Sequence, residues 1–409
     1  MIVDELRIIG STQTNVVMAA ELVRVARRAL GVRPPTPRKE GLGQLVLPFD
    51  RGLAWAAVTY MRTPTRVLWD VYRSRATRLE PLYDDLVADV RADARALFRD
   101  GEGLSVEARR VEAFAAGDRQ IVGTVKNALI DGAARRGFRL HVDPDRPALR
   151  WVARLDDRGE LVLSIDLGGG SLSQRGWRRD AGEAPLREHL AAVLLMLCRF
   201  DPRTDILVDP MCGSGTIPIE ALHAARATPR VASGALAALG LLGPVGPVGP
   251  VGPAAPAGPA QPLYPDAQPL VIGCDVDLDV LAAARDNGRA AGVADQVIWQ
   301  RADVTTLRPE MIADIARERG HAVTPQSGGP LTGLLLANPP YGERLVEADL
   351  YELYTALAQT CRRFRGWRAG FLVGNPLLEQ AFLSAVGPPR IKKPLANANL
   401  RAYFFLYDL

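Results

Sequence analysis

Residues 338–341 read Asn-Pro-Pro-Tyr and follow the apolar run LLLA, which is typical of a buried strand. Proline fixes its own φ and restricts the residue before it, so Asn338 and Pro339 are both held rigidly by the prolines that follow them. The Asn338 side-chain oxygen and the Pro339 carbonyl can therefore act as two fixed hydrogen-bond acceptors at the end of a strand. Two such acceptors can bind both hydrogens of an amino group, and Tyr341 can stack on a flat ring that carries it.

The amino group that fits this pattern is the exocyclic amine of a nucleobase, which is planar because its lone pair is conjugated with the ring. Accepting both hydrogens pulls the nitrogen toward a pyramidal geometry and directs its lone pair at an electrophile. No strong base is required, because the alkylated nitrogen loses its extra proton readily. The pattern therefore predicts methyl transfer to a base nitrogen, with a tight loop after a strand as the alternative interpretation.

A glycine-rich turn earlier in the chain predicts a cofactor site. The segment DPMCGSGT (209–216) joins the end of an expected strand to the start of a helix through Gly213 and Gly215. Such a turn lets a ligand approach backbone amides at a helix N-terminus. A dinucleotide-binding fingerprint would need a third glycine where Pro218 stands, and the Gly-Lys pair of a phosphate-binding P-loop is absent.

Three acidic residues stand where successive strands of the same region should end: Asp209, Asp275 and Asp303. Asp275 is placed to accept both ribose hydroxyls of a nucleoside. Asp303 could hold an adenine amino group, and Asp209 would lie near a sulfonium and amino acid end. Any one of them could instead cap a helix or a turn. Their order, together with the glycine turn, favours S-adenosylmethionine as the cofactor.

The elements that must position these residues follow Asp201, where a continuous apolar strand, a glycine turn and a helix recur. This alternation predicts an α/β Rossmann-like domain over 201–409, with a parallel sheet covered on both faces. The Gly/Pro-rich segment 243–262 contains three Gly-Pro-Val units, which are too few for a collagen helix. We expect it to be a disordered surface loop inserted in this domain.

The first 200 residues show a different order of elements. Apolar spacing predicts helices over 18–31, 79–98 and 121–134, a buried strand over 53–61, and a β-hairpin formed by 149–155 and 160–167. Helices followed by paired strands indicate a small α+β domain over about 75–170.

Composition limits the classes of protein that this chain can be. At 409 residues we expect two or three domains. No apolar run reaches the ~20 residues that span a bilayer, and two acids stand within the first five residues, so neither a membrane helix nor a signal peptide is predicted and we expect a cytoplasmic protein. The four cysteines form no Cys-x-x-Cys pair, so we expect neither a disulfide framework nor a metal site.

Charge is distributed unevenly between the halves of the chain. Lys and Arg outnumber Asp and Glu by 32 to 26 over 1–200, which gives +6, whereas 18 stand against 20 over 201–409, which gives −2. Nearly all the basic residues are Arg, which can pair with phosphate and stack on bases. The first half therefore favours contacts with nucleic acid, although an Arg-rich solvated surface is the alternative.

The chain resembles the bacterial THUMP-domain guanine-N2 RNA methyltransferases of the large-subunit ribosomal RNA type. Matching segments are RGWRRDAGEAPLREHLAA (175–192), DPMCGSGTIPIEA (209–221), GCDVD (273–277), NPPYGERL (338–345) and the closing LANANLRAYFFLYDL. The resemblance implies a ferredoxin-like subdomain over 1–74, a THUMP RNA-binding module over 75–170 and an approach helix within 171–200, all preceding the methyltransferase domain.

The resulting hypothesis is methyl transfer from S-adenosylmethionine to a guanine N2 in structured RNA. Large-subunit ribosomal RNA is the first expected substrate and transfer RNA the second. Adenine-N6 methylation of DNA or RNA is an alternative, because adenine also carries an exocyclic amine. A non-catalytic RNA-binding or assembly protein is an alternative from a different class. No membrane partner is expected, and the oligomeric state is left open.

Overall fold

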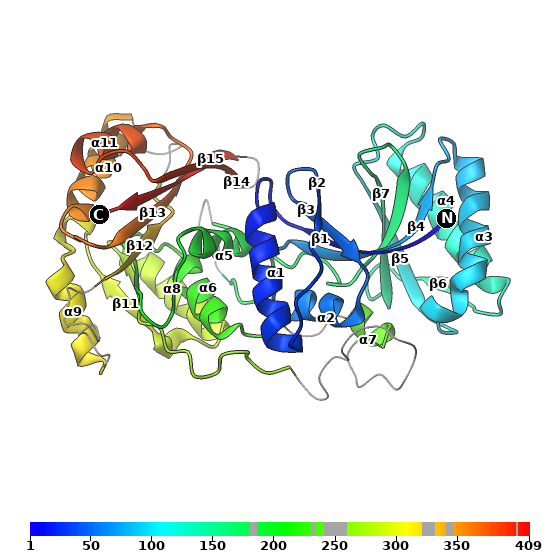
Figure 1. Ribbon diagram of the computed structural model, residues 1–409, viewed down its shortest axis with the longest axis horizontal. Coiled ribbons are helices and arrows are strands. Elements are labelled where there is room, and N and C mark those ends of the chain that lie inside the picture. Colours follow the sequence, from blue (N-terminus) through cyan, green and yellow to red (C-terminus); the bar gives the residue numbers. More distant parts are fainter. Residues whose placement is uncertain (180–185, 231–233, 241–259, 321–331, 341–346, 398–399) are drawn as a thin grey trace. The chain divides into compact units, whose positions relative to one another are not determined.

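The computed structural model describes residues 1–179, 186–230, 234–240, 260–320, 332–340, 347–397 and 400–409 (Figure 1). The chain divides into two compact units. Unit 1 comprises Met1–Gly10, Thr14–Leu172 and Pro229–Ala260, and unit 2 comprises Ser11–Gln13, Ser173–Thr228 and Gln261–Leu409. The described helices include none that is both long and apolar enough to cross a membrane.

The described part of unit 1 is built around an eight-stranded sheet in the order β2-β3-β1-β4-β8-β7-β5-β6. Its strands are β1 (Ile2–Ile9), β2 (Arg38–Glu40), β3 (Gln44–Pro48), β4 (Arg66–Ser74), β5 (Gly103–Arg109), β6 (His141–Val142), β7 (Leu149–Leu155) and β8 (Leu161–Asp166). Its helices are α1 (Asn15–Leu30), α2 (Arg51–Tyr60), α3 (Leu79–Leu97), α4 (Asp118–Ala134) and α7 (Gly234–Ala238). Figure 1 shows α3 and α4 lying side by side.

The sequence expectations for unit 1 are confirmed for three helices and one hairpin. Helices α1, α3 and α4 form where their apolar spacing predicts them, and β7 and β8 pair antiparallel. Helix α1 ends at Gly31, whose φ of 71° is the left-handed conformation expected of a C-terminal cap. These elements were predictable because each carries its own period and its own stop signal.

The strand predicted over 53–61 is wrong, because this apolar run forms helix α2. The Asp50 side chain accepts a hydrogen bond from the Leu53 backbone N–H at 2.7 Å and so caps the helix N-terminus. All residues of α2 after Arg51 are buried. A helix that is buried on every side has no polar face, so its sequence cannot be told from that of a buried strand by periodicity.

The regions expected over 1–74 and 75–170 share one sheet. Strand β4 from the first pairs antiparallel with β8 from the second, for example at Leu68 and Asp166. Both regions lie in the same compact unit, whose first long segment ends at Leu172. Their assignment as a ferredoxin-like subdomain and a THUMP module stays a prediction.

The described part of unit 2 contains a seven-stranded sheet in the order β11-β10-β9-β12-β13-β15-β14. Its strands are β9 (Ile206–Asp209), β10 (Val271–Asp275), β11 (Val297–Arg301), β12 (Gly333–Ala337), β13 (Arg368–Val373), β14 (Ile391–Asn397) and β15 (Leu400–Asp408). The first five are parallel, and β14 and β15 form the expected closing hairpin. This arrangement confirms the predicted Rossmann-like α/β fold.

Helices cover both faces of this sheet. They are α5 (Glu188–Leu197), α6 (Thr216–Arg226), α8 (Leu278–Ala290), α9 (Pro309–Glu318), α10 (Glu347–Cys361) and α11 (Leu377–Ala385). One face shares a buried apolar cluster with α9, α10 and α11, which includes Ile272, Leu335 and Phe371. Burial of both faces explains why the parallel strands are continuous apolar runs in the sequence.

The chain between α6 and β10 returns to unit 1. The Arg230 backbone N–H donates to the Thr59 carbonyl at 2.9 Å, and its guanidinium donates to the Val58 carbonyl at 2.7 Å. Helix α7 packs with β7 of the same unit. The segment was expected to be an insertion within the C-terminal domain. Its preceding flank, from Pro229, belongs to unit 1, whereas the chain from Gln261 onward belongs to unit 2. Most of 243–262, the segment predicted to be a disordered loop, lies outside the described residues.

Candidate functional site

The ends of four neighbouring parallel strands bring most of the expected site residues to one edge of the unit 2 sheet. In the register of β9 and β10, Asp209 pairs with Gly273, two residues before Asp275. Strand β12 lies on the other side of β9 and ends one residue before Asn338. Asp303 follows β11, the neighbour of β10. Ligands of open α/β sheets bind at the carboxyl ends of the strands, where these residues stand.

The glycine turn between β9 and α6 depends on two left-handed residues. Gly213 has a φ of 51° and Gly215 a φ of 83°. A Cβ atom on Gly215 would also lie 2.7 Å from Cη2 of Trp299, so a side chain is excluded there by space as well as by conformation. The turn ends at Thr216, the first residue of α6. The first amides of this helix therefore point toward the strand ends.

Asp275 joins this turn to the end of β10. Its Oδ2 accepts a hydrogen bond from the Gly213 backbone N–H at 3.0 Å, and its Oδ1 accepts one from the Asp277 backbone N–H at 3.1 Å. The Cys212 backbone N–H also donates to the Cys274 carbonyl at 2.8 Å. The carboxylate is thus held in place by backbone groups while remaining partly exposed. Each oxygen keeps a further lone pair for a ligand hydroxyl.

Asp209 is almost completely buried, with 1% of its surface exposed. Burial raises the pKa of its carboxyl well above the usual value, a hydrogen bond from the Met211 backbone N–H opposes the rise, and the charge of Asp275 adds to it. Burial therefore shifts the protonation equilibrium of Asp209 toward its neutral form. A positive group bound nearby would favour the ionised form instead.

Asp303 is exposed and caps the short 3-10 helix η2 (Val304–Thr306). Its Oδ1 accepts hydrogen bonds from the Thr305 backbone N–H at 2.8 Å and from the Thr305 hydroxyl at 2.7 Å. These two bonds lower the pKa of the Asp303 carboxyl. The turn-capping role that the sequence left as an alternative is therefore present, and both bonds leave Oδ2 for a ligand.

Asn338 carries a buried acceptor. Its Oδ1 has no hydrogen-bond partner among the residues that the structure describes, and Pro339 beside it is buried. Leaving a buried acceptor unpaired costs roughly 1–3 kcal/mol, so such groups are uncommon outside functional sites. Tyr341, expected to stack on a base, lies outside the described residues.

Tyr354 is a residue of this site that sequence reasoning missed. It lies on α10, is fully buried, and its hydroxyl donates to the Pro340 carbonyl at 2.7 Å. This bond fixes the chain directly after the Asn338–Pro339 pair. In the sequence Tyr354 is one apolar position of an ordinary helix, and no local pattern indicates its partner.

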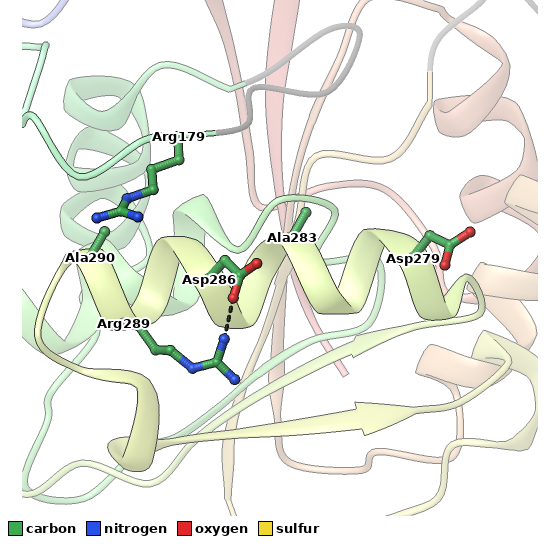
Figure 2. A pocket seen from close by; sticks show the side chains of 6 residues that line it. All are labelled: Arg179, Asp279, Ala283, Asp286, Arg289 and Ala290. Atoms are coloured by element: carbon green, nitrogen blue, oxygen red, sulfur yellow. Dashed lines mark hydrogen bonds and ion pairs between the residues drawn. The ribbon is translucent and has the colours of Figure 1, made fainter.

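A hollow of about 620 Å³ lies along α8, and Figure 2 shows the side chains that line it. Its lining consists of Arg179, Asp279, Ala283, Asp286, Arg289 and Ala290. Arg289 pairs with Asp286 within the helix. None of the expected cofactor or catalytic residues lines it. The described residues contain no group of three or more His, Cys, Asp or Glu side chains that could hold a metal ion.

Comparison with known proteins connects this geometry to one group of enzymes. Residues 175–317 match the family model described as the RMKL-like methyltransferase domain. The chain is 35% identical over 291 residues to the "Ribosomal RNA large subunit methyltransferase K/L" of Aeromonas hydrophila. That match covers 69% of this chain and 40% of the relative, so the chain spans about two fifths of the length of the curated relatives it matches.

Solved structures extend the likeness of fold to nearly the whole chain. SMU.472, crystallised in complex with SAH, superposes with a TM-score of 0.73 at 21% identity and covers 99% of this chain and 98% of its own. TrmN from Thermus thermophilus superposes with a TM-score of 0.64 at 21% identity and covers 99% of both chains. The resemblance to large-subunit ribosomal RNA methyltransferases expected from the sequence is confirmed, and it is centred on residues 175–317, which match the RMKL-like methyltransferase model.

Proposed function

We propose that this chain transfers a methyl group from S-adenosylmethionine to the exocyclic N2 amine of a guanine in structured RNA. Large-subunit ribosomal RNA is the first substrate class and transfer RNA the second. The observation that carries the proposal is the buried Oδ1 of Asn338 at the end of β12, for which the described residues offer no hydrogen-bond partner. It lies on the same sheet edge as the glycine turn and Asp275, and the matched domain supports the reaction class.

The cofactor would be held by the ends of β9, β10 and β11. Asp275 accepts the ribose hydroxyls with the lone pairs that Gly213 and Asp277 leave available. Oδ2 of Asp303 accepts from the adenine amino group, and Asp209 favours the cationic end of the molecule because a nearby positive charge stabilises its ionised form. S-adenosylmethionine, when bound, supplies an electrophilic methyl group.

The residues at the end of β12 would prepare the base. Oδ1 of Asn338 accepts one hydrogen of the amine and the Pro339 carbonyl accepts the other, which directs the nitrogen lone pair at the methyl group. Tyr354 holds the following carbonyl, that of Pro340, so these acceptors keep their geometry. Tyr341 stacks on the ring of the base. The proton released from the methylated nitrogen passes to solvent.

The RNA would be held mainly by the N-terminal half of the chain. Residues 1–200 carry a net charge of +6, whereas 201–409 carry −2. Phosphate contacts from Arg side chains give binding that weakens steeply with salt. The target base must leave its stack, which favours a nucleotide in a loop or bulge. We propose that 75–170 acts as a THUMP module and 1–74 as a ferredoxin-like subdomain in this binding, and that the protein acts in the cytoplasm.

A labelling experiment tests the proposal. The full chain is incubated with methyl-labelled S-adenosylmethionine and, in separate reactions, with unmodified large-subunit ribosomal RNA, transfer RNA or duplex DNA, and each product is digested to nucleosides. The expected label is in N2-methylguanosine from ribosomal RNA. Because the same two acceptors fit the adenine amine, label in N6-methyladenosine would replace the guanine reading with the adenine one.

A further inference from the structure

The segment Arg-Gly-Trp-Arg-Arg (175–179) lies against the cofactor turn and contacts it through Arg178. Nη2 of Arg178 donates to Oγ1 of Thr216 at 2.9 Å, and Nη1 donates to Oγ of Ser214 at 3.3 Å. These two hydroxyls stand on either side of Gly215, whose φ is 83°. One guanidinium therefore bridges the two residues on either side of the left-handed Gly215.

The same guanidinium is fixed on its other side. Nε of Arg178 donates to Oε1 of Glu188 at 3.0 Å, and Nη2 also donates to the Leu186 carbonyl at 2.9 Å. Glu188 is the first residue of α5 and only 7% exposed, and the ring of Trp177 lies 5.3 Å from Cζ of Arg178. The planar guanidinium of arginine has five N–H donors and can reach all of these acceptors. The ammonium of a lysine is a single point charge and cannot.

Two further contacts tie the segment to the helices that flank the turn. The fully buried Asn287 of α8 accepts a hydrogen bond from the Arg179 backbone N–H at 2.9 Å and donates one to the Ser214 carbonyl at 3.0 Å. Nε of Arg175 donates to Oε1 of Glu220 on α6 at 3.2 Å, and both side chains are buried. The turn is thereby held through the hydroxyls of Ser214 and Thr216 and through the Ser214 carbonyl. The helix that follows it, α6, is held through Glu220.

We propose that residues 175–179 form a positioning element for the cofactor turn, and that Arg178 acts through the hydroxyls of Ser214 and Thr216. The proposal rests on the proposed function, because the turn is the part of the site that would receive the amino acid end of the cofactor. Two left-handed glycines leave the turn with many accessible conformations. Holding it in one conformation before the ligand arrives lowers the cost of binding.

A double-mutant cycle tests whether Arg178 acts through the turn. Binding of S-adenosylhomocysteine to the full chain is measured by calorimetry for Arg178→Met, Thr216→Val and the double variant. Losing a hydrogen bond from a charged donor costs ~1.5–3 kcal/mol, so we expect Arg178→Met to weaken binding by about tenfold or more. The double variant should bind no more weakly than Arg178→Met, because the two changes remove the same contact.

A ligand without the amino acid part locates the effect. All variants should bind 5′-methylthioadenosine within about twofold of the unsubstituted chain, because Asp275 and Asp303 are untouched. Arg203→Met is the matched control, since the Arg203 side chain is 83% exposed and pairs with Asp201 at the surface. Its affinity for both ligands should stay unchanged. Arg178→Lys keeps the positive charge but lacks the planar guanidinium, so it should also bind S-adenosylhomocysteine more weakly. It replaces Arg178→Met in the test if that variant fails to fold.

The outcomes separate this inference from the function on which it rests. Unchanged affinity of Arg178→Met for S-adenosylhomocysteine would overturn the positioning role. Losses that multiply in the double variant would do the same, because they would mean that Arg178 does not act through Thr216. Failure of the unsubstituted chain to bind S-adenosylhomocysteine would instead reject the proposed function itself.

Discussion

Replacing Asn338 with alanine should separate activity from stability. Asn338→Ala removes an acceptor that the reaction needs, so turnover should fall by roughly 10²–10³, or about 2.7–4 kcal/mol in activation free energy, as for other preorganised transition-state partners. The affinity for S-adenosylhomocysteine should stay nearly intact, because the ribose and turn contacts come from β9 and β10.

Although Asn338→Ala should lower turnover, it should not lower the stability of the fold. Oδ1 of Asn338 is buried without a partner among the described residues, and such an acceptor costs roughly 1–3 kcal/mol in the folded state. Its removal relieves that cost, while the small, partly exposed side chain gives up little packing. The free energy of unfolding should therefore be unchanged or higher, with a melting temperature unchanged or raised by a few degrees.

A second Asn-Pro pair provides the control. Asn375 precedes Pro376 after the neighbouring strand β13, and it is partly exposed like Asn338. Its Oδ1, however, accepts a hydrogen bond from the Leu377 backbone N–H at 2.9 Å. Asn375→Ala should thus destabilise the protein by about 1 kcal/mol and leave turnover per folded molecule unchanged.

The assay combines single-turnover methylation of ribosomal RNA, calorimetry and thermal unfolding on the three proteins. Turnover of Asn338→Ala within about fivefold of the unsubstituted chain would refute the acceptor role, since loss of one preorganised partner costs far more than that. A large drop in its melting temperature would show that Oδ1 has a structural partner and would refute the argument from burial.

Four further changes have defined outcomes. Asp275→Ala should weaken S-adenosylhomocysteine binding by at least tenfold in calorimetry, because a charged acceptor of two hydroxyls is lost; equal affinity would reject its role. Asp209→Asn should raise the melting temperature relative to the unsubstituted chain increasingly as pH rises from 4 to 8. The raised pKa of Asp209 means that the folded state keeps its proton, so the stability from this group is present at low pH and lost as pH rises; a pH-independent difference would contradict this. Tyr354→Phe should lower kcat with little change in cofactor affinity, because it frees the Pro340 carbonyl, and an unaltered kcat would remove Tyr354 from the site. Replacing 243–262 with a short Gly/Ser linker should leave methylation nearly unchanged, since loop closure depends weakly on length, whereas loss of RNA binding would give the segment a substrate role.

Much of unit 2 could be predicted because its signals are local. Each parallel strand is a short apolar run. The residue that matters is the last of the strand, as Asp275 is, or follows it directly, as Asn338 does. Proline and glycine also have distinctive backbone conformations, so the glycine turn and the Asn-Pro-Pro segment could be predicted from a few residues.

The contacts that support the site could not be predicted because they join distant segments. Arg178 reaches Thr216 across 38 positions, and Tyr354 reaches Pro340 from a separate helix. The sequence around Arg178 or Tyr354 does not indicate which residue each one contacts. Helix α2 differs from the strand predicted over 53–61 for a related reason, since its burial on all sides removes the periodicity that distinguishes a helix from a strand.

The division into units also exceeded what the sequence could indicate. The strand-helix pattern begins at about Asp201, but the compact unit that contains it already includes the chain from Ser173, and with it α5. Helix α5 packs with α6, and the residues before it hold the glycine turn. A fragment that starts at 201 would therefore lack contacts that the site uses.

The position and chemistry of the methyl group test the central claim most directly. Unmodified large-subunit ribosomal RNA is treated with S-adenosylmethionine and either the unsubstituted chain or Asn338→Ala, and the product is mapped by oligonucleotide-resolved mass spectrometry. The account predicts one methyl group on the N2 of one guanine with the unsubstituted chain, and almost none with the variant in the same time. A methyl group on adenine N6 or on another guanine atom, or equal methylation by Asn338→Ala, would contradict it.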